Sequence, residues 1–353
     1  MTPPGNPAAA GAPSARRILI ILMGAIGDVV RALPLLGRLR RGYPDAHLAW
    51  AVEPLSEPLL RGHPWLDQVL VYERNHAPWS FPSFLRQVRQ GRFDLVLDLQ
   101  RHLKSGITAW VSAAPRRVGF AAANSKEYNY WFTSEQIEPQ PPMRLKLMQY
   151  QAFAEYLGLP AAPVEFGLSA GAAEIARAQE LIGELPAPLL AILLGSSWPS
   201  RDIFPEMAAE TALSLHHNHG LTPLLIGGSK ERELADAVMR RLGQIPAANL
   251  VGRTSLRDLL AIFPRCTAAF GPDCGPMHIA AAAGCPVVSL WGATAPERSA
   301  PWGFDELTIK APIPCHPCYL RHCPIDRECM RRISPALVAL TVERAMTAAL
   351  QSA

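Results

Sequence analysis

Short apolar runs alternate along the chain with longer segments in which apolar residues recur every three or four positions. Runs of four to eight apolar residues that end in glycine or polar loops are typical of buried strands, and the longer period is typical of amphipathic helices. In the first half we expect strands at residues 17–22, 47–52, 68–72 and 94–99, and helices at 28–41, 81–90 and 145–157. This alternation indicates βαβ units and a parallel sheet.

The same pattern restarts after a stretch that contains Pro160, Pro163 and Gly167. Beyond it we expect a helix at 174–182, strands at 189–194, 221–226, 267–270 and 286–291, and a last amphipathic helix at 335–350. Each of these strands runs into a glycine-containing loop, and open parallel sheets bind ligands beyond the carboxyl ends of their strands. The pattern therefore predicts an α/β protein of two doubly wound domains that face each other across a cleft.

Length and composition agree with this organisation. The chain has 353 residues, of which 49% are hydrophobic, and this is enough for two domains that each have a core. No apolar run approaches the roughly 20 residues of a membrane span. Residues 1–15 are rich in proline, alanine and glycine and lack the layout of a signal peptide, so we expect a disordered tail and a cytoplasmic protein.

Charge points to an anionic ligand. The formal net charge is only +4, which argues against a nucleic-acid-binding protein. Between positions 74 and 126, however, the only acids are Asp94 and Asp98, against nine basic residues: Arg74, Arg86, Arg89, Arg92, Arg101, Lys104, Arg116, Arg117 and Lys126. Two interpretations stay open: solvated helix faces, or a patch that meets phosphates or an anionic membrane surface.

Four of the seven cysteines are concentrated in the pattern Cys315-x2-Cys318-x4-Cys323-x5-Cys329. In a cytosolic protein such a cluster suggests a metal site or redox chemistry. The spacing matches no common zinc ribbon. We therefore favour reduced structural thiols over a metal site.

The first expected strand ends in the loop Met23-Gly24-Ala25-Ile26-Gly27-Asp28. An aspartate in the first turn of a helix commonly caps that helix and favours the positive end of its dipole. At the carboxyl end of a strand, the Asp28 carboxylate would also point into the expected cleft, where it could accept a proton from a hydroxyl. The loop lacks the full G-x-G-x-x-G pattern, so a dinucleotide site is poorly supported.

The loop Gly271-Pro272-Asp273-Cys274-Gly275-Pro276-Met277-His278 predicts an anion site in the second half. Pro276 suits the first position of a helix, and the free amides at such a helix start bind anions such as a diphosphate. His278 lies one turn into the helix, where a structural role is the simpler interpretation.

Two further loops fit the same ligand. Ser196 and Ser197 offer donors to phosphate, and Arg201 offers a two-pronged donor unless it is an ordinary surface arginine. Glu231, after Gly227-Gly228, could accept hydrogen bonds from ribose hydroxyls. No Asp-x-Asp pair for a metal-bound sugar diphosphate occurs. A transferase would therefore have to neutralise its leaving group with helix amides and basic side chains.

In this order and at these separations, the motifs resemble glycosyltransferase family 9, the bacterial heptosyltransferases of lipopolysaccharide core assembly. The segments that carry the resemblance are residues 17–34, Asp98-Leu99-Gln100 with Lys104-Ser105, Arg117-Val118-Gly119-Phe120, residues 271–280, 284–288 and 292–294, and the cysteine cluster followed by Ile333-Ser334-Pro335. Five positions depart from the usual family pattern: Leu22 and Met23 before the glycine loop, Arg101, Arg201 in place of lysine, and Cys274 in place of threonine or serine.

The resemblance implies a GT-B architecture of two Rossmann-like domains: an acceptor-binding domain at 16–165, a nucleotide-sugar-binding domain at 166–334, and a helix at 335–353 that packs back on the N-terminal domain. It implies an inverting, metal-independent transfer of heptose from ADP-heptose, without a cofactor, to a hydroxyl of an anionic, lipid-linked inner-core saccharide. The enzyme would work at the inner face of the cytoplasmic membrane.

By match to the family's motifs, Asp28 would be the catalytic base. The donor would be held by Ser196, Ser197, Arg201, Glu231, Asp273, Cys274, Gly275, Pro276, Met277 and His278. The acceptor would be held by Gly27, Lys104, Arg117 and Lys126. Two other functions would suit the same fold: a sugar-nucleotide 2-epimerase, and a catalytically silent protein that binds a sugar nucleotide or a membrane surface.

Overall fold

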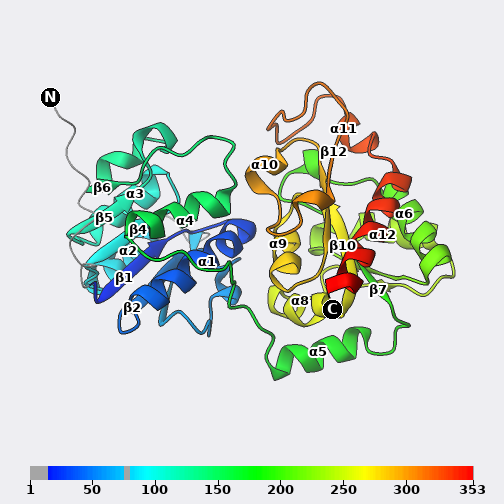
Figure 1. Ribbon diagram of the computed structural model, residues 1–353, viewed down its shortest axis with the longest axis horizontal. Coiled ribbons are helices and arrows are strands. Elements are labelled where there is room, and N and C mark those ends of the chain that lie inside the picture. Colours follow the sequence, from blue (N-terminus) through cyan, green and yellow to red (C-terminus); the bar gives the residue numbers. More distant parts are fainter. Residues whose placement is uncertain (1–14, 75–79, 353) are drawn as a thin grey trace. The chain divides into compact units, whose positions relative to one another are not determined.

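The computed structural model describes residues 15–74 and 80–352 and divides the chain into two compact units, Met1–Gly167 and Leu168–Ala353 (Figure 1). The boundary predicted between residues 165 and 166 lies two residues before this division. The disordered tail predicted for residues 1–15 lies outside the described residues, apart from residue 15.

The first unit is built on a six-stranded parallel sheet with the order β3-β2-β1-β4-β5-β6. The strands are β1 (Arg17–Ile21), β2 (His47–Val52), β3 (Gln68–Val71), β4 (Leu95–Asp98), β5 (Arg116–Gly119) and β6 (Glu135–Gln136). The helices are α1 (Ile26–Gly42), α2 (Ser80–Gln90), α3 (Leu103–Val111) and α4 (Lys146–Tyr156), with short 3-10 turns η1 (Glu57–Leu59), η3 (Ala122–Asn124) and η4 (Asn129–Phe132). The strand order reverses between β1 and β4, so the carboxyl ends of these two strands form the switch point of the sheet.

The second unit repeats this plan with the order β12-β11-β10-β7-β8-β9. Its strands are β7 (Leu189–Leu193), β8 (Thr222–Ile226), β9 (Ala248–Asn249), β10 (Cys266–Pro272), β11 (Val287–Trp291) and β12 (Thr308–Lys310). Its helices are α5 (Ala172–Ile182), α6 (Pro205–His219), α7 (Arg232–Leu242), α8 (Leu256–Ile262), α9 (Gly275–Ala282), α10 (Pro296–Ser299), α11 (Glu328–Arg331) and α12 (Pro335–Ser352). The 3-10 turns are η5 (Pro199–Arg201), η6 (Ser229–Glu231), η7 (Phe263–Arg265) and η8 (Asp305–Leu307). The switch point here lies between β7 and β10.

The predicted strands are all present, with ends shifted by at most two residues. Most of these apolar runs are fully or almost fully buried, whereas in β3 only Leu70 is. The apolar positions of α1 that have helical spacing, among them Val29, Leu33 and Leu36, are likewise buried. Strands β5, β6, β9 and β12 were not predicted. They have only two to four residues, too few for a period to be visible.

Helix α12 confirms the predicted last helix. It packs against α6, β10 and β11 of its own unit, and Val338, Ala339 and Val342 enter the core of that unit. The predicted packing of this helix on the N-terminal domain stays a prediction. Within the described residues, no helix is both long enough and apolar enough to cross a membrane.

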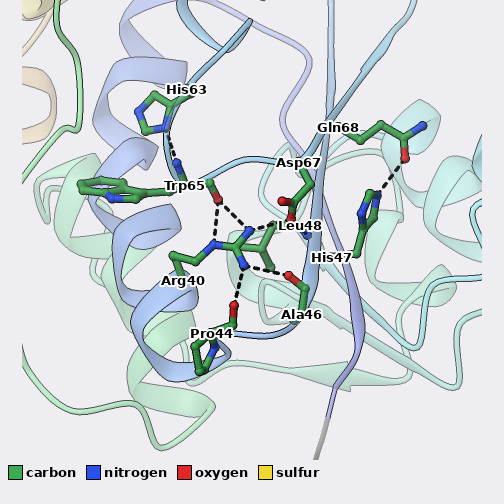
Figure 2. A network of polar contacts seen from close by, with 9 residues as sticks. All are labelled: Arg40, Pro44, Ala46, His47, Leu48, His63, Trp65, Asp67 and Gln68. Carbon is green, nitrogen blue, oxygen red and sulfur yellow. Dashed lines mark hydrogen bonds and ion pairs between the residues drawn. The ribbon is translucent and has the colours of Figure 1, made fainter.

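A polar network ties the last turn of α1 to the sheet of the first unit (Figure 2). The Arg40 guanidinium donates to the carbonyls of Pro44, Ala46 and Trp65 and pairs with the Asp67 carboxylate at 2.6 Å. The same carboxylate oxygen accepts a hydrogen bond from the Leu48 amide at 2.7 Å. Because His47 and Gln68 begin β2 and β3, this clamp holds the amino ends of the two strands. The carboxyl ends of β2 and β3 take no part in this network.

Candidate active site

Asp28 lies in the first turn of α1, just beyond the carboxyl end of β1. The loop that leads to it is fixed from two sides, since Trp50 Nε1 donates to the Leu22 carbonyl at 3.1 Å and the Met23 amide donates to Gln100 Oε1 at 2.8 Å. Ala25 is the N-cap of α1, and no side chain caps this helix. The capping hydrogen bond considered for Asp28 is therefore wrong, because its carboxylate is engaged elsewhere, whereas its place in the first turn agrees with the predicted interaction with the helix dipole.

The Asp28 carboxylate is held by two cations and a phenol. Its Oδ1 atom lies 2.6 Å from Arg31 Nη2 and 2.7 Å from Lys146 Nζ, and the Tyr150 hydroxyl hydrogen-bonds to the same carboxylate. Burial on its own would raise the pKa of Asp28, but the charges of Lys146 and Arg31 outweigh burial and hold that pKa well below its ordinary value. Burial and the neighbouring Asp28 charge raise the pKa of Tyr150, so the phenol stays protonated and donates.

More polar groups surround the carboxyl ends of β2 and β4. Arg101, three residues after the end of β4, donates to Gln149 Oε1 and places its guanidinium 3.9 Å from the centre of the Phe120 ring. The Lys104 ammonium lies 4.7 Å from the centre of the Tyr72 ring. A β-carbon added to Gly24 would lie 3.9 Å from the Glu53 carboxylate, so this second acid is close to the glycine loop. The edge that carries Asp28 thus combines two carboxylates with several cations.

The residues predicted to bind the acceptor do not all gather at this edge. Gly27 is buried in the first turn of α1, Lys104 lies in the first turn of α3, and the amide of Lys126 donates to the Arg101 carbonyl at 2.9 Å. Arg117 is different. It pairs with Val96 inside the sheet, and its guanidinium donates to the carbonyls of Ala114 and Phe132. The structure does not bring Arg117 to the Asp28 edge.

In the second unit, Arg201 and Asp273 form a buried ion pair. Arg201 Nη1 lies 3.0 Å from Asp273 Oδ2, and Thr294 Oγ1 donates to the same oxygen at 2.8 Å. The guanidinium also lies 4.1 Å from the centre of the Trp198 ring. Both charged side chains are only slightly exposed, at 14% and 11%. This arrangement joins the loops after β7, β10 and β11.

Ser196 and Glu231 complete this edge. The Ser196 amide donates to Asp202 Oδ1 at 3.0 Å, and burial, together with the nearby charge of Glu231, raises the pKa of Asp202 to about 6. Glu231 packs over the glycines that follow β7 and β8, because a β-carbon on Gly195 would lie 2.3 Å from its side chain. These glycines therefore make room for the acid. Ser197 follows Ser196 in the same loop.

Helix α9 begins at Gly275 with Pro276 in its first turn and Cys274 as its N-cap. The Cys274 thiol is buried, which raises its pKa to about 12, and it lies within the electrostatic influence of Asp273, Arg201 and Glu231. The predicted donor residues of three loops are thus neighbours. Met277 and His278 are buried in the helix, which agrees with the structural interpretation of the histidine.

The four clustered cysteines surround the end of β11. Burial raises the pKa of the Cys329 thiol, and the nearby Cys323, Cys315 and Cys318 contribute to this rise. The sulfur of Cys329 would lie 2.7 Å from a β-carbon added to Gly292. All four are free thiols. Among residues 15–74 and 80–352, no group of three or more His, Cys, Asp and Glu side chains is arranged to hold a metal ion.

Comparison with known proteins identifies the family. Residues 82–328 match the family model of glycosyltransferase family 9 (heptosyltransferase). The chain belongs to this family. It is therefore a glycosyltransferase, as the order of its motifs predicted. The match covers β4, β5 and β6 of the first sheet and all strands of the second.

Relatives agree over most of the chain. The lipopolysaccharide core heptosyltransferase OpsX of Haemophilus influenzae is 28% identical over 289 residues, which cover 81% of this chain and 82% of that protein. Lipopolysaccharide heptosyltransferase 1 of Pseudomonas aeruginosa is 24% identical over 364 residues, which cover 94% and 98%. The sequence of this glycosyltransferase is thus similar to those of lipopolysaccharide heptosyltransferases over most of its length.

Solved structures have the same fold. A family 9 glycosyl transferase from Veillonella parvula superposes with a TM-score of 0.81 at 20% identity, over 94% of this chain and 97% of that one. ADP-heptose heptosyltransferase II of Escherichia coli gives a TM-score of 0.76 at 21% identity, over 96% and 100%. The predicted α/β fold of GT-B type, with two Rossmann-like domains, is confirmed.

Sequence reasoning missed Arg31, Lys146, Tyr150 and Thr294 as site residues. Arg31 lies three positions after Asp28, so helical spacing alone would have placed the two side chains on one face. Lys146 is 118 residues away from Asp28, and no local signal connects them.

Proposed function

We propose that this glycosyltransferase moves a heptose from ADP-heptose to a hydroxyl of an anionic, lipid-linked saccharide of the lipopolysaccharide inner core, with inversion and without a metal ion. The names of its relatives support the substrates: one is a lipopolysaccharide core heptosyltransferase, and a similar solved structure is the E. coli heptosyltransferase WaaC with ADP-2-deoxy-2-fluoro heptose. The observation that carries the proposal is the Asp28 carboxylate at the switch point of the first sheet, held by Lys146 and Arg31.

The reaction is a single displacement. The acceptor oxygen forms a bond to the anomeric carbon while the bond from that carbon to the diphosphate oxygen breaks, and the acceptor proton passes to Asp28. Positive charge develops on the sugar ring, as in glycoside hydrolysis. ADP leaves with the electron pair of the broken bond.

Asp28 is a weak base as long as Lys146 and Arg31 share one of its oxygens. A phosphate or carboxylate on the acceptor competes for the same two cations. As these cations turn toward the acceptor, Asp28 loses part of their stabilising charge and its proton affinity increases. The base is thus strengthened when the anionic acceptor is bound.

The departing diphosphate is stabilised by the second unit. Arg201, Ser196 and Ser197 supply donors, and the first-turn amides of α9, at Gly275 and Met277, supply the positive end of the helix. Asp273 orients Arg201 and also neutralises it until the nucleotide arrives. Glu231 packs against the glycines that follow β7 and β8, which supports its proposed role as the acceptor of hydrogen bonds from ribose. The proposed transfer needs no metal ion.

The remaining predictions complete the proposal. The enzyme works in the cytoplasm at the inner face of the membrane, where the lipid-linked acceptor is found. A sugar-nucleotide 2-epimerase on the same fold would turn over ADP-heptose without any acceptor. A silent binding protein would bind ADP and release none from the donor.

The test is ADP release from ADP-heptose with a defined inner-core acceptor, in the presence and absence of EDTA. We expect acceptor-dependent release that EDTA leaves unchanged. Asp28→Asn should fold normally by circular dichroism and lose roughly 10²- to 10⁴-fold in turnover, the usual contribution of a positioned base. Asp45→Asn, an exposed loop residue, is the control. Near-wild-type turnover by Asp28→Asn would refute its role, and release without acceptor would favour the epimerase.

A further inference from the structure

Large apolar side chains are exposed on one part of the first unit. Leu103 and Trp110 on α3 are 42% and 61% exposed, and Tyr128 and Trp131 at η4 are 62% and 68% exposed. The two elements pack against each other. We call these four residues the α3–η4 surface. Several large apolar side chains exposed on two elements that pack together commonly mark an interaction site.

The α3–η4 surface rests on a rigid base. Asn129, fully buried at the start of η4, donates through Nδ2 to Asp98 Oδ2 at 2.7 Å, to the His102 carbonyl at 2.9 Å and to Ser105 Oγ at 3.2 Å. A β-carbon on Gly106 would lie within 3.0 Å of Asn129, so only glycine lets η4 approach α3 this closely. The aromatic residues around Asn129 are therefore displayed from a fixed framework.

The backbone before η4 is strained. Glu127 and Tyr128 have φ angles of 51° and 55°, in the left-handed region that non-glycine residues rarely occupy. This conformation holds Tyr128 stacked on Trp131, with ring centres 4.7 Å apart, and both rings face solvent. Strain that keeps aromatic rings exposed is unfavourable for folding and points to a function outside the fold.

Basic side chains flank the α3–η4 surface. Lys126 is exposed directly before the strained pair, and α2, which packs beside α3, exposes Arg86 and Arg89. Glu127 is the acid at this place, and its carboxylate accepts from the Leu103 amide at 3.0 Å and pairs with His102. The surroundings of the aromatic residues thus carry a net positive charge.

We propose that the α3–η4 surface docks on an anionic lipid bilayer. Tryptophan and tyrosine side chains prefer the interface between headgroups and acyl chains, and neighbouring Lys and Arg side chains are attracted to anionic headgroups. This inference rests on the proposed function, because a lipid-linked acceptor requires the enzyme at a membrane. Asn129 is anchored by Asp98, the last residue of β4, and by His102, four residues later. Strand β4 is the neighbour of β1, the strand that leads to Asp28.

Two other occupants fit less well. Leu103 and Trp110 are seven residues apart on α3, so they lie on one face of the helix about 10 Å apart, farther than one sugar ring extends. A second copy of the chain in a symmetric pair would bring the same flanking cations together, which is unfavourable. An anionic bilayer is wide enough to contact all four side chains of the α3–η4 surface, and its negative charge attracts the flanking cations.

The experiment measures co-sedimentation of the full chain with phosphatidylcholine vesicles, with and without phosphatidylglycerol. We expect binding that needs the anionic lipid and weakens in high salt. The double variant Trp110→Ser/Trp131→Ser should bind at least about tenfold less, because its apolar contacts with the interface are lost. The control is Leu337→Ser/Leu340→Ser, which removes two side chains of α12 that are each 45% exposed in the second unit.

Activity separates the outcomes. The tryptophan variant should release ADP as fast as the wild type with a water-soluble, delipidated acceptor. Wild-type vesicle binding by this variant, or absence of binding by the wild type, would overturn the inference. Loss of activity on the soluble acceptor would also overturn it and indicate a saccharide platform. A protein that binds vesicles through this surface but transfers no heptose would refute the proposed function alone.

Discussion

At the scale of single residues, the site depends on shared charges. Asp28 pairs with two cations in the first unit, and Arg201 pairs with an acid in the second. A charge that is neutralised by a neighbour in the ligand-free protein can be released when a ligand of the right sign arrives. Both pairs are partly buried, so water screens them less than exposed ion pairs.

Replacement of Lys146 tests this on Asp28. Lys146→Met removes a cation that lowers the pKa of Asp28, so this pKa should rise. The base must be ionised to accept a proton. The acidic limb of the activity profile should therefore move to a higher pH in this variant. The same variant lacks the cation that binds the anionic group of the acceptor, so we also expect kcat/KM at neutral pH to fall by about tenfold, the effect of one lost charged hydrogen bond to the acceptor. The measurement is the pH profile of kcat/KM. The control is Lys310→Met, which removes an exposed lysine of the second unit that pairs with Glu297.

An acidic limb at the same pH in Lys146→Met and wild type would separate Lys146 from the ionisation of Asp28. The role of this lysine would then be limited to holding α4 against α1. The rest of the proposed mechanism would still rest on Asp28→Asn.

At the scale of elements, the two edges of the first sheet have different tasks. The carboxyl ends of β1, β2 and β4 carry the polar groups around Asp28, whereas the amino ends of β2 and β3 are held by the Arg40 clamp (Figure 2). A fixed amino edge lets the loops at the carboxyl edge take positions set by ligand chemistry.

The clamp predicts a pH-dependent stability. The Leu48 amide and Arg40 outweigh the effect of burial and lower the pKa of Asp67 below its ordinary value of 3.8. A lowered carboxyl pKa stabilises the fold fully above the ordinary value, and this contribution is lost as the pH falls through the lowered pKa. We expect Asp67→Asn to cost about 1 kcal/mol at pH 7, since the pair is partly exposed, and almost nothing in strong acid.

Hydrogen exchange of α1 and β2 amides, followed by mass spectrometry, reports this local stability at each pH. Asp305→Asn in the second unit is a control that should leave those amides unchanged. A cost for Asp67→Asn that did not depend on pH would mean that the charge of Asp67 contributes nothing to the clamp.

At the scale of the whole molecule, the proposed function divides the chemistry between two units of the same plan. The predicted base belongs to the first sheet, and the predicted diphosphate site belongs to loops of the second. Mutations in the two units should therefore affect different steps of the reaction.

Calorimetric titration with ADP tests the division. Arg201→Ala should weaken ADP binding by at least about tenfold, because it removes one charged donor and leaves the Asp273 carboxylate without its cation. Asp28→Asn should leave ADP affinity unchanged, and so should Arg241→Ala, a control for the loss of an exposed arginine of the same unit. Unchanged affinity of Arg201→Ala would remove this residue from the nucleotide site.

The sequence by itself determined the two α/β domains, the positions of their main strands along the chain and the family. Apolar runs between glycine loops can be recognised locally, and the loops after β1, β7 and β10 keep their motif residues together along the chain. Short strands such as β6 and β9 and the packing of α12 could not be recognised in this way.

Only the tertiary structure decided which charges meet. Lys146 contacts Asp28, 118 residues away in the chain, and Arg201 contacts Asp273, 72 residues away. Arg117 instead donates hydrogen bonds to carbonyls near its own strand. The rigid display of Tyr128 and Trp131 likewise depends on Asn129 reaching Asp98. The physical reason is that a residue type shows which charge or ring is available, whereas its partner, and therefore its pKa and its role, depends on which distant segment packs beside it.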